Sequence, residues 1–154
     1  HNLLDQLTQL RTDSNLLVEW SGVALRHFNG YLYANVTQLP LDNNLYSWDL
    51  QVKLLLENGE YRAQQVVGCG LQLNGSVTVC FRPQAPSSGE TIKKVMQAKA
   101  IPPWQRDAVP LVFVDKQLIA IADMWVRHSC CVKDESQQGW YLTWEPVVNS
   151  DLLR

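Results

Sequence analysis

The spacing of apolar residues changes near residue 16 of this 154-residue chain. Before that point Leu3, Leu4, Leu7 and Leu10 recur at steps of three and four, which predicts a short amphipathic helix over residues 2–12. Beyond it, apolar and polar positions alternate in short runs separated by turn residues, as in half-buried strands. The pattern therefore predicts a three-stranded meander with strands at residues 16–20, 23–28 and 31–36.

Asn-Gly pairs stand between apolar runs at residues 29–30, 58–59 and 74–75. Such a pair favours a tight hairpin, because both turn residues must adopt positive φ. The two later pairs predict further antiparallel strands at residues 51–57, 60–67, 71–73 and 76–82. Residues 37–50 contain Pro40 and an Asp/Asn cluster without a clear period, so a domain boundary is expected there.

One helix is predicted in the second half, over residues 91–100, with Ser88 or Thr91 as its N-cap residue. The stems of four of its side chains are spaced for burial: Ile92, Val95, Met96 and Lys99. The helix must end by Ile101, because Pro102 and Pro103 cannot continue it. Strands are then expected at residues 111–114, 118–126 and 140–145, with a turn at residues 115–117. The fold class is α+β, mainly antiparallel β.

Composition supports a folded chain, since 46% of the residues are hydrophobic and only 18% are charged. No apolar run approaches the length of a membrane span, and residues 1–12 do not form a signal peptide. The chain opens at His1 directly into the helical pattern, from which we expect that an upstream part is missing. The four cysteines show no C-x-x-C spacing, so we expect reduced thiols in a cytoplasmic protein and no metal site.

The net charge of −2 hides an uneven distribution. Residues 82–107 carry five basic residues against Glu90 and Asp107, whereas acidic residues outnumber basic ones in residues 1–60 and 108–154. A local positive island of this kind is typical of an anion-binding surface. The basic residues of the island are Arg82, Lys93, Lys94, Lys99 and Arg106.

Catalytic motifs are missing from the sequence. The eight glycines form neither a phosphate-binding loop nor a dinucleotide-binding fingerprint, and no G-x-S-x-G elbow accompanies His27 or His128. The acidic pair Asp134 and Glu135 lies in a polar segment, where solvated charge is the default interpretation. We therefore expect no catalytic residue in this chain.

The segment from Thr91 to Arg106 is the best candidate for binding. Lys93 and Lys94 are consecutive, so both cannot face a core, and Lys99 lies further along. The rigid Pro102-Pro103-Trp104 elbow would then hold Arg106 in place with little loss of entropy. Lysines on a helix and an arginine on a rigid turn suit phosphate oxygens. A solvated helix face, with Trp104 as a core residue, is the alternative that the residues alone leave open.

These residues resemble the C-terminal domain of the tRNA(Ile)-lysidine synthetase family. The family typically reads LKKLFQE, PPWxRD, PLL and LVAVAGLWV, and the corresponding residues here are 92–94, 101–107, 110–111 and 118–126. Residues 26–33 are similar to the family's RRYxxxLY hairpin. The sequence departs from the family pattern at three places. Residues 84–90 are shorter and more nearly neutral than the family's Gly/Arg-rich stretch, and His27 stands where a second arginine is common. Residues 122–124 read Ala-Asp-Met in place of the usual Ala-Gly.

The resemblance implies a parent that is an ATP-dependent ligase. Such an enzyme attaches lysine to the wobble cytidine of a CAU-anticodon isoleucine tRNA, using ATP with Mg and lysine as substrates. Its catalytic S-G-G-x-D-S loop does not occur here, so we expect this chain to be inactive alone. The implied organisation is part of a central substrate-recognition domain (residues 1–40), a linker and β region (41–75) and a β-sandwich-like C-terminal tRNA-binding domain (76–154).

The resemblance also implies the partners and the binding residues. The partners are the acceptor region of the tRNA and a missing N-terminal catalytic domain, while a homodimer of the parent stays open. The residues expected to contact tRNA are Lys93, Lys94, Lys99, Arg106, Arg82 and Arg26, with Trp104, Pro102 and Pro103 as the elbow anchor. The alternative is a protein–protein or interdomain docking module without RNA contact, which six tryptophans and a negative net charge would suit.

Overall fold

The computed structural model describes residues 16–20, 23–36 and 44–147, and the chain divides into two compact units. The described part of the first unit is a three-stranded antiparallel sheet, here called sheet A, with strands β1 (Leu16–Trp20), β2 (Val23–Phe28) and β3 (Tyr31–Val36). Asn29 and Gly30 connect β2 and β3 with φ angles of 50° and 81°, so the predicted meander and this turn are confirmed. The helix predicted over residues 2–12 lies outside the described residues.

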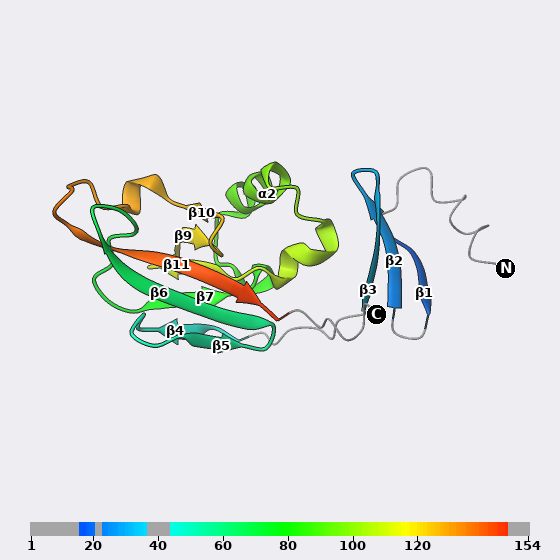
Figure 1. The fold of residues 1–154 in the computed structure, drawn as a ribbon, viewed down its shortest axis with the longest axis horizontal. Coiled ribbons are helices and arrows are strands. Elements are labelled where there is room, and N and C mark those ends of the chain that lie inside the picture. Colours follow the sequence, from blue (N-terminus) through cyan, green and yellow to red (C-terminus); the bar gives the residue numbers. More distant parts are fainter. Residues whose placement is uncertain (1–15, 21–22, 37–43, 148–154) are drawn as a thin grey trace. The chain divides into compact units, whose positions relative to one another are not determined.

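The second unit, residues 41–147, contains two further antiparallel sheets (Figure 1). Sheet B has the order β10-β9-β8-β7-β4, and sheet C has the order β11-β6-β5. The strands of sheet B are β4 (Tyr46–Trp48), β7 (Val77–Cys80), β8 (Leu111–Val114), β9 (Gln117–Ile121) and β10 (Trp125–Val126). Those of sheet C are β5 (Leu54–Leu56), β6 (Gly59–Val67) and β11 (Gln138–Pro146).

Four helical segments complete the described chain. The α-helix α2 spans Gly89–Ala98, and three short 3-10 helices are η1 (Arg82–Gln84), η2 (Pro103–Ala108) and η3 (His128–Cys130). The fold class is therefore α+β and mainly antiparallel β, as the sequence predicted.

Sheet B is buried on both faces, so the second unit has three layers. One face packs against sheet C around a core of Trp48, Tyr61, Val79 and Leu142, which gives a β-sandwich. The other face packs against α2. A bulge lets β9 serve both layers: the pairing moves from Val112–Ala120 to Phe113–Leu118 and skips Ile119. Ile119 and Ala120 consequently face the sandwich, whereas Leu118 and Ile121 face the helix.

Tyr61 spans the sandwich from β6. Its ring stacks on Trp48, with the ring centroids 5.0 Å apart, and it meets the Trp144 ring edge-on, with the centroids 5.7 Å apart. Its hydroxyl donates a hydrogen bond of 2.5 Å to the carbonyl of Ala122, in the turn that follows β9. A buried carbonyl needs such a donor, because leaving it unpaired costs free energy. One side chain thus joins sheet C to the edge of sheet B.

Several predicted element bounds are wrong. Glu57 and Asn58 connect β5 to β6, and Gly59 belongs to β6, where a Cβ would approach the carbonyl oxygen of Glu145 and the ring of Trp144. No strand forms at residues 71–73, since Leu71 makes only isolated bridges to Cys131 and Trp140. At Gly59, close approach of Trp144 and Glu145 on β11, rather than turn preference, decides the outcome.

The strand predicted over residues 118–126 is also wrong. It is two antiparallel strands, β9 and β10, separated by a turn at Ala122, whose φ is 46°. The N–H of Ala122 donates to Pro110 O at 2.8 Å, and its carbonyl accepts the Tyr61 hydroxyl. Hydrogen bonds on both sides hold an alanine in a backbone region that it rarely adopts.

Replacing Tyr61 by Phe should lower the free energy of unfolding by about 1–3 kcal/mol, because the buried Ala122 carbonyl loses its donor. Urea denaturation of the chain measures the change. Tyr141→Phe is the matched control: Tyr141 is 56% exposed on β11, and its variant should stay within about 0.5 kcal/mol of the parent chain. Equal stability of both variants would show that the hydrogen bond contributes nothing.

The stability of the chain should fall as the pH rises above about 9. Burial raises the pKa of the Cys80 thiol from 9.0 to about 11. As the pH rises, the unfolded chain loses the thiol proton near pH 9, whereas the folded chain loses it only near pH 11. The free energy of unfolding therefore declines between pH 9 and pH 11. Burial, and then the charge of Asp123, raises the pKa of Tyr61 in the same direction. Urea titrations from pH 8 to pH 11 should show a shallower decline for Cys80→Ala, and identical slopes would contradict the assignment.

Candidate nucleic-acid interface

Helix α2 attaches to sheet B by a narrow apolar stripe. Ile92 and Met96, four residues apart, are fully buried against β8 and β9, and each contributes roughly 1.5–3 kcal/mol by burial. The helix begins at Gly89 and ends at Ala98, two residues before the predicted bounds at each end. Ser88 is the N-cap residue, but its side chain makes no capping hydrogen bond, and its φ is 69°.

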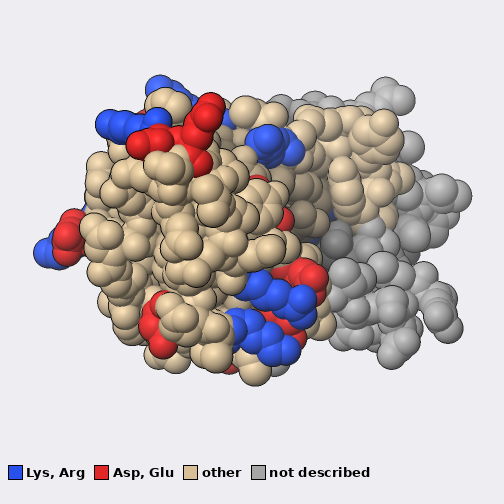
Figure 2. Space-filling model, turned by 60° about the vertical axis from the view of Figure 1, so that its left-hand side comes forward, with Lys and Arg blue, Asp and Glu red and all other residues tan. Residues whose placement is uncertain are grey.

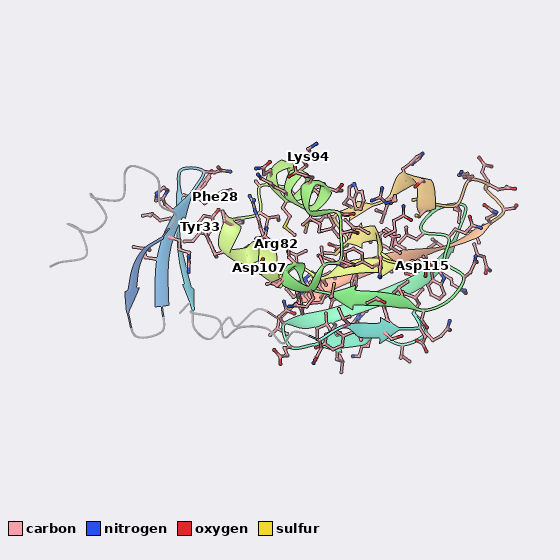
Figure 3. All side chains as sticks on the ribbon, turned by 180° about the vertical axis from the view of Figure 1, so that it is seen from behind. Phe28, Tyr33, Arg82, Lys94, Asp107 and Asp115 are labelled. Atoms are coloured by element: carbon pink, nitrogen blue, oxygen red, sulfur yellow. The ribbon has the colours of Figure 1, made fainter. Side chains whose placement is uncertain are left out.

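The lysines of this region point away from the fold. Lys93 and Lys94 are exposed on α2, and Figure 3 shows Lys94 on the outer side of the helix. Lys99 follows the end of the helix and is exposed as well, so its predicted burial with Ile92 and Met96 is wrong. Within the described part of the chain, these three ammonium groups form no ion pair. They therefore present uncompensated charge within seven residues.

Arg82 lies at the start of η1 and does not present free charge. Its Nε is 2.8 Å from a carboxylate oxygen of Asp107 in η2, and Figure 3 shows the two side chains together. This ion pair joins the two 3-10 helices that flank α2 in the sequence. An external phosphate would have to compete with Asp107 for the guanidinium.

The elbow is the 3-10 helix η2, with Pro102 as its N-cap residue and Pro103 in its first turn. Pro102 is buried, whereas Pro103 and Trp104 are half-buried, so the elbow is anchored in the fold. Arg106 turns back toward the end of α2, where its Nε donates to Ile101 O at 2.9 Å. The structure thus adds an anchor that the sequence did not predict.

Arg26 belongs to sheet A, opposite Tyr33 on β3, and it is half-buried. It therefore lies in the first unit, while the other predicted binding residues lie in the second. The structure brings together Lys93, Lys94 and Lys99 on and beside α2, and it joins Arg82 to η2.

One arginine on the α2 side of sheet B was not predicted from the sequence. The Nε of Arg127 donates to Leu118 O at 2.7 Å, and its guanidinium carbon lies 5.5 Å from the ring centre of Trp125. The signal was present as the Trp-x-Arg spacing of residues 125–127, which repeats the spacing of Trp104 and Arg106.

Two other basic residues of the second unit, Lys53 and Arg62, are paired with acids on the outer face of sheet C. Lys53 and Arg62 both reach Glu60, at 3.3 and 2.8 Å, and Arg62 also lies 3.6 Å from Glu145. The Arg62 guanidinium, and then Lys53, hold the pKa of Glu60 below its ordinary value. On the face that Figure 2 draws, several Lys and Arg side chains lie beside Asp or Glu side chains.

The tryptophans are largely used inside the fold. Trp48 is 2% exposed, and Trp140 and Trp144 pack against the sandwich core. Trp125 packs against the core beneath α2. The alternative of a protein–protein docking module required these rings to be available for a partner. Their packing inside the fold weakens that alternative.

The described residues offer little for other chemistry. No group of three His, Cys, Asp or Glu side chains among them is arranged to hold a metal ion. None of the helices in the described ranges has the length and apolar character needed to cross a membrane. All four cysteines are free, and Cys80 is buried.

The fold and these side chains define a β-sandwich-like α+β domain with a basic helix on its outer sheet face. Residues 75–144 match the family model described as the TilS substrate C-terminal domain. The chain is 28% identical over 158 residues to the tRNA(Ile)-lysidine synthase of Pectobacterium atrosepticum, covering 93% of the chain and 35% of that protein. It is 29% identical over 161 residues to that of Coxiella burnetii, covering 92% and 36%.

A shorter match, to the tRNA(Ile)-lysidine synthase of Yersinia pseudotuberculosis, is 36% identical over 73 residues, which is 47% of the chain and 15% of that protein. These findings confirm the resemblance: residues 75–144 match the C-terminal domain of the family, and the chain is similar to tRNA(Ile)-lysidine synthases over most of its length. It spans about a third of the length of the longer-matching relatives.

Asp107→Asn should strengthen binding of a tRNA transcript by about twofold to fivefold, because it releases Arg82 from its ion pair. The free energy of unfolding should change by no more than about 1 kcal/mol, since the side chains of Arg82 and Asp107 are both partly exposed. Asp115→Asn, at the exposed turn after β8, removes the same charge elsewhere and serves as control in the same filter-binding assay. Equal strengthening by both variants would attribute the effect to net charge alone.

Proposed function

We propose that this chain is the tRNA-recognition part of an ATP-dependent ligase that forms lysidine. The parent enzyme would attach lysine to the wobble cytidine of a CAU-anticodon isoleucine tRNA. The relatives support this proposal, because each is a tRNA(Ile)-lysidine synthase. The observation that carries it is the cluster of exposed lysines at α2, Lys93, Lys94 and Lys99, which have no acidic partner among the described residues.

Unpaired lysines suit a polyanion better than a neutral or acidic partner. Neutralising phosphates releases condensed counterions, which favours binding and makes the affinity depend on salt. The stripe formed by Ile92 and Met96 fixes α2 on sheet B, so the lysines project from a rigid support. In this proposal Lys93, Lys94 and Lys99 contact phosphates of the tRNA acceptor region. Arg106 joins them, and Arg82 does so where phosphate displaces Asp107.

The remaining predicted residues have a different place in the proposal. Pro102, Pro103 and Trp104 hold the elbow that positions Arg106, and they make no phosphate contact themselves. Arg26 would act from the first unit as part of the central substrate-recognition domain. The α2 lysines therefore supply most of the proposed contact.

The chemistry of the parent would take place outside this chain. ATP with Mg, and lysine, would bind to a catalytic domain that carries the S-G-G-x-D-S loop, a motif missing from these 154 residues. That domain is the proposed covalent partner, and the cytoplasm is the proposed location. Incubating the chain with ATP, Mg, lysine and the tRNA should give no lysidine, whereas turnover by the chain alone would overturn this part.

Replacing Lys93 and Lys94 together by Ala should weaken binding to a CAU-anticodon isoleucine tRNA transcript by about tenfold or more. The slope of log affinity against log salt should fall by roughly one for each lysine lost. Binding measured from 50 to 200 mM KCl gives both quantities. Both side chains are exposed, so the free energy of unfolding should change little.

The matched control is the double variant Lys53→Ala, Arg62→Ala, which removes two positive charges from the ion pairs of sheet C. It should leave both the affinity and the salt slope near those of the parent chain. Equal weakening by the two double variants would refute the assignment to α2. Unchanged binding by both would refute tRNA recognition through these residues.

A further inference from the structure

The sequence contains two Trp-x-Arg pairs, and the structure fixes both arginines in the same way. Arg106 donates its Nε–H to Ile101 O at 2.9 Å, and Arg127 donates its Nε–H to Leu118 O at 2.7 Å. Neither guanidinium forms an ion pair with a carboxylate of the described residues, in contrast to Arg82. The first arginine is already part of the proposed tRNA surface, whereas the second is not.

The side chain of Arg127 is held from several directions. Its guanidinium lies over the Trp125 ring, 5.5 Å from the centroid, where the ring face attracts a cation. Its backbone N–H donates to Ile119 O at 2.8 Å, and its carbonyl accepts from the N–H of Cys130 at 3.0 Å. Arg127 is half-buried, so these contacts hold its side chain without burying it completely.

Arg127 also lies on the helix side of sheet B. Trp125, whose ring it covers, packs against the same apolar cluster as Ile92 and Met96 of α2. The charge of Arg127 is therefore presented on the side that carries Lys93 and Lys94, and not on the outer face of sheet C, where Arg62 is paired with acids.

We propose that Arg127, clamped between the Leu118 carbonyl and the Trp125 ring, is a further phosphate-binding residue of the tRNA surface. With its Nε occupied, the two Nη groups keep a planar pair of donors, which suits two oxygens of one phosphate. Because the clamp has already fixed the rotamer, binding costs less conformational entropy than it does for a free lysine. The inference rests on the proposed function and adds the β10–η3 edge to the α2 surface.

The test compares Arg127→Gln, Arg127→Lys and the control Arg62→Gln in the 154-residue chain, with the CAU-anticodon isoleucine tRNA transcript as probe. Arg127→Gln should weaken binding at least about fivefold and lower the salt slope by about one. Arg127→Lys keeps the charge but loses the planar donors, so the slope should persist while affinity falls. Arg62→Gln removes one charge from the other face and should change neither quantity.

The outcomes separate this inference from the proposal on which it rests. If Arg127→Gln binds like Arg62→Gln while the Lys93, Lys94 double variant is impaired, Arg127 only anchors the fold and the inference is overturned. If neither Arg127→Gln nor the double variant changes binding, the proposed function fails as well. Impaired binding by Arg127→Gln alone supports Arg127 and removes the two lysines from the site.

A second measurement covers loss of folding in the variants. In the unmodified chain, the side-chain NMR signals of Arg127 should shift when the transcript is added, and those of Arg62 should stay in place. Arg127 signals that do not respond to saturating tRNA would overturn the inference regardless of how stable the variants are.

Discussion

The second unit depends on the Tyr61 side chain, which connects sheet C to the turn that follows β9 in sheet B. It stacks on Trp48, meets the edge of Trp144 and donates its hydroxyl proton to the carbonyl of Ala122. The turn at Ala122 reverses the chain into β10, which brings Trp125 beneath α2 and places Arg127 over it. The placement of Arg127 thus depends on a hydrogen bond in the sandwich core.

Hydrophobic period and turn chemistry predicted much of this fold. The alternating runs of residues 16–36 and the Asn29-Gly30 turn form the predicted meander, because each is specified locally. Locally specified elements are the ones that a single sequence can reveal. Gly59 and Gly75 follow asparagine as Gly30 does, yet neither adopts positive φ. Packing of Trp144 over Gly59, a contact from a distant strand, decides the first of these cases.

The sequence was enough to predict the exposed lysines of the candidate site. It was not enough to predict which groups the arginines contact. Consecutive lysines on an amphipathic helix must include an outward one, and both Lys93 and Lys94 are exposed. The partner of Arg82 could not be found from spacing, because Asp107 is brought to it by the docking of η2 near η1. The anchoring of Arg127 depends on the register of β9, where the bulge at Ile119 sets which carbonyl faces the arginine.

The attachment of α2 mainly by Ile92 and Met96 has an evolutionary consequence. Two buried positions satisfy the packing of the helix, so the outward positions carry almost no structural constraint. Charges there can be gained, lost or moved along the helix while the sandwich beneath remains intact. The charge pattern of this helix can therefore change independently of the stability of the domain, and the helix surface can be retuned without rebuilding the fold.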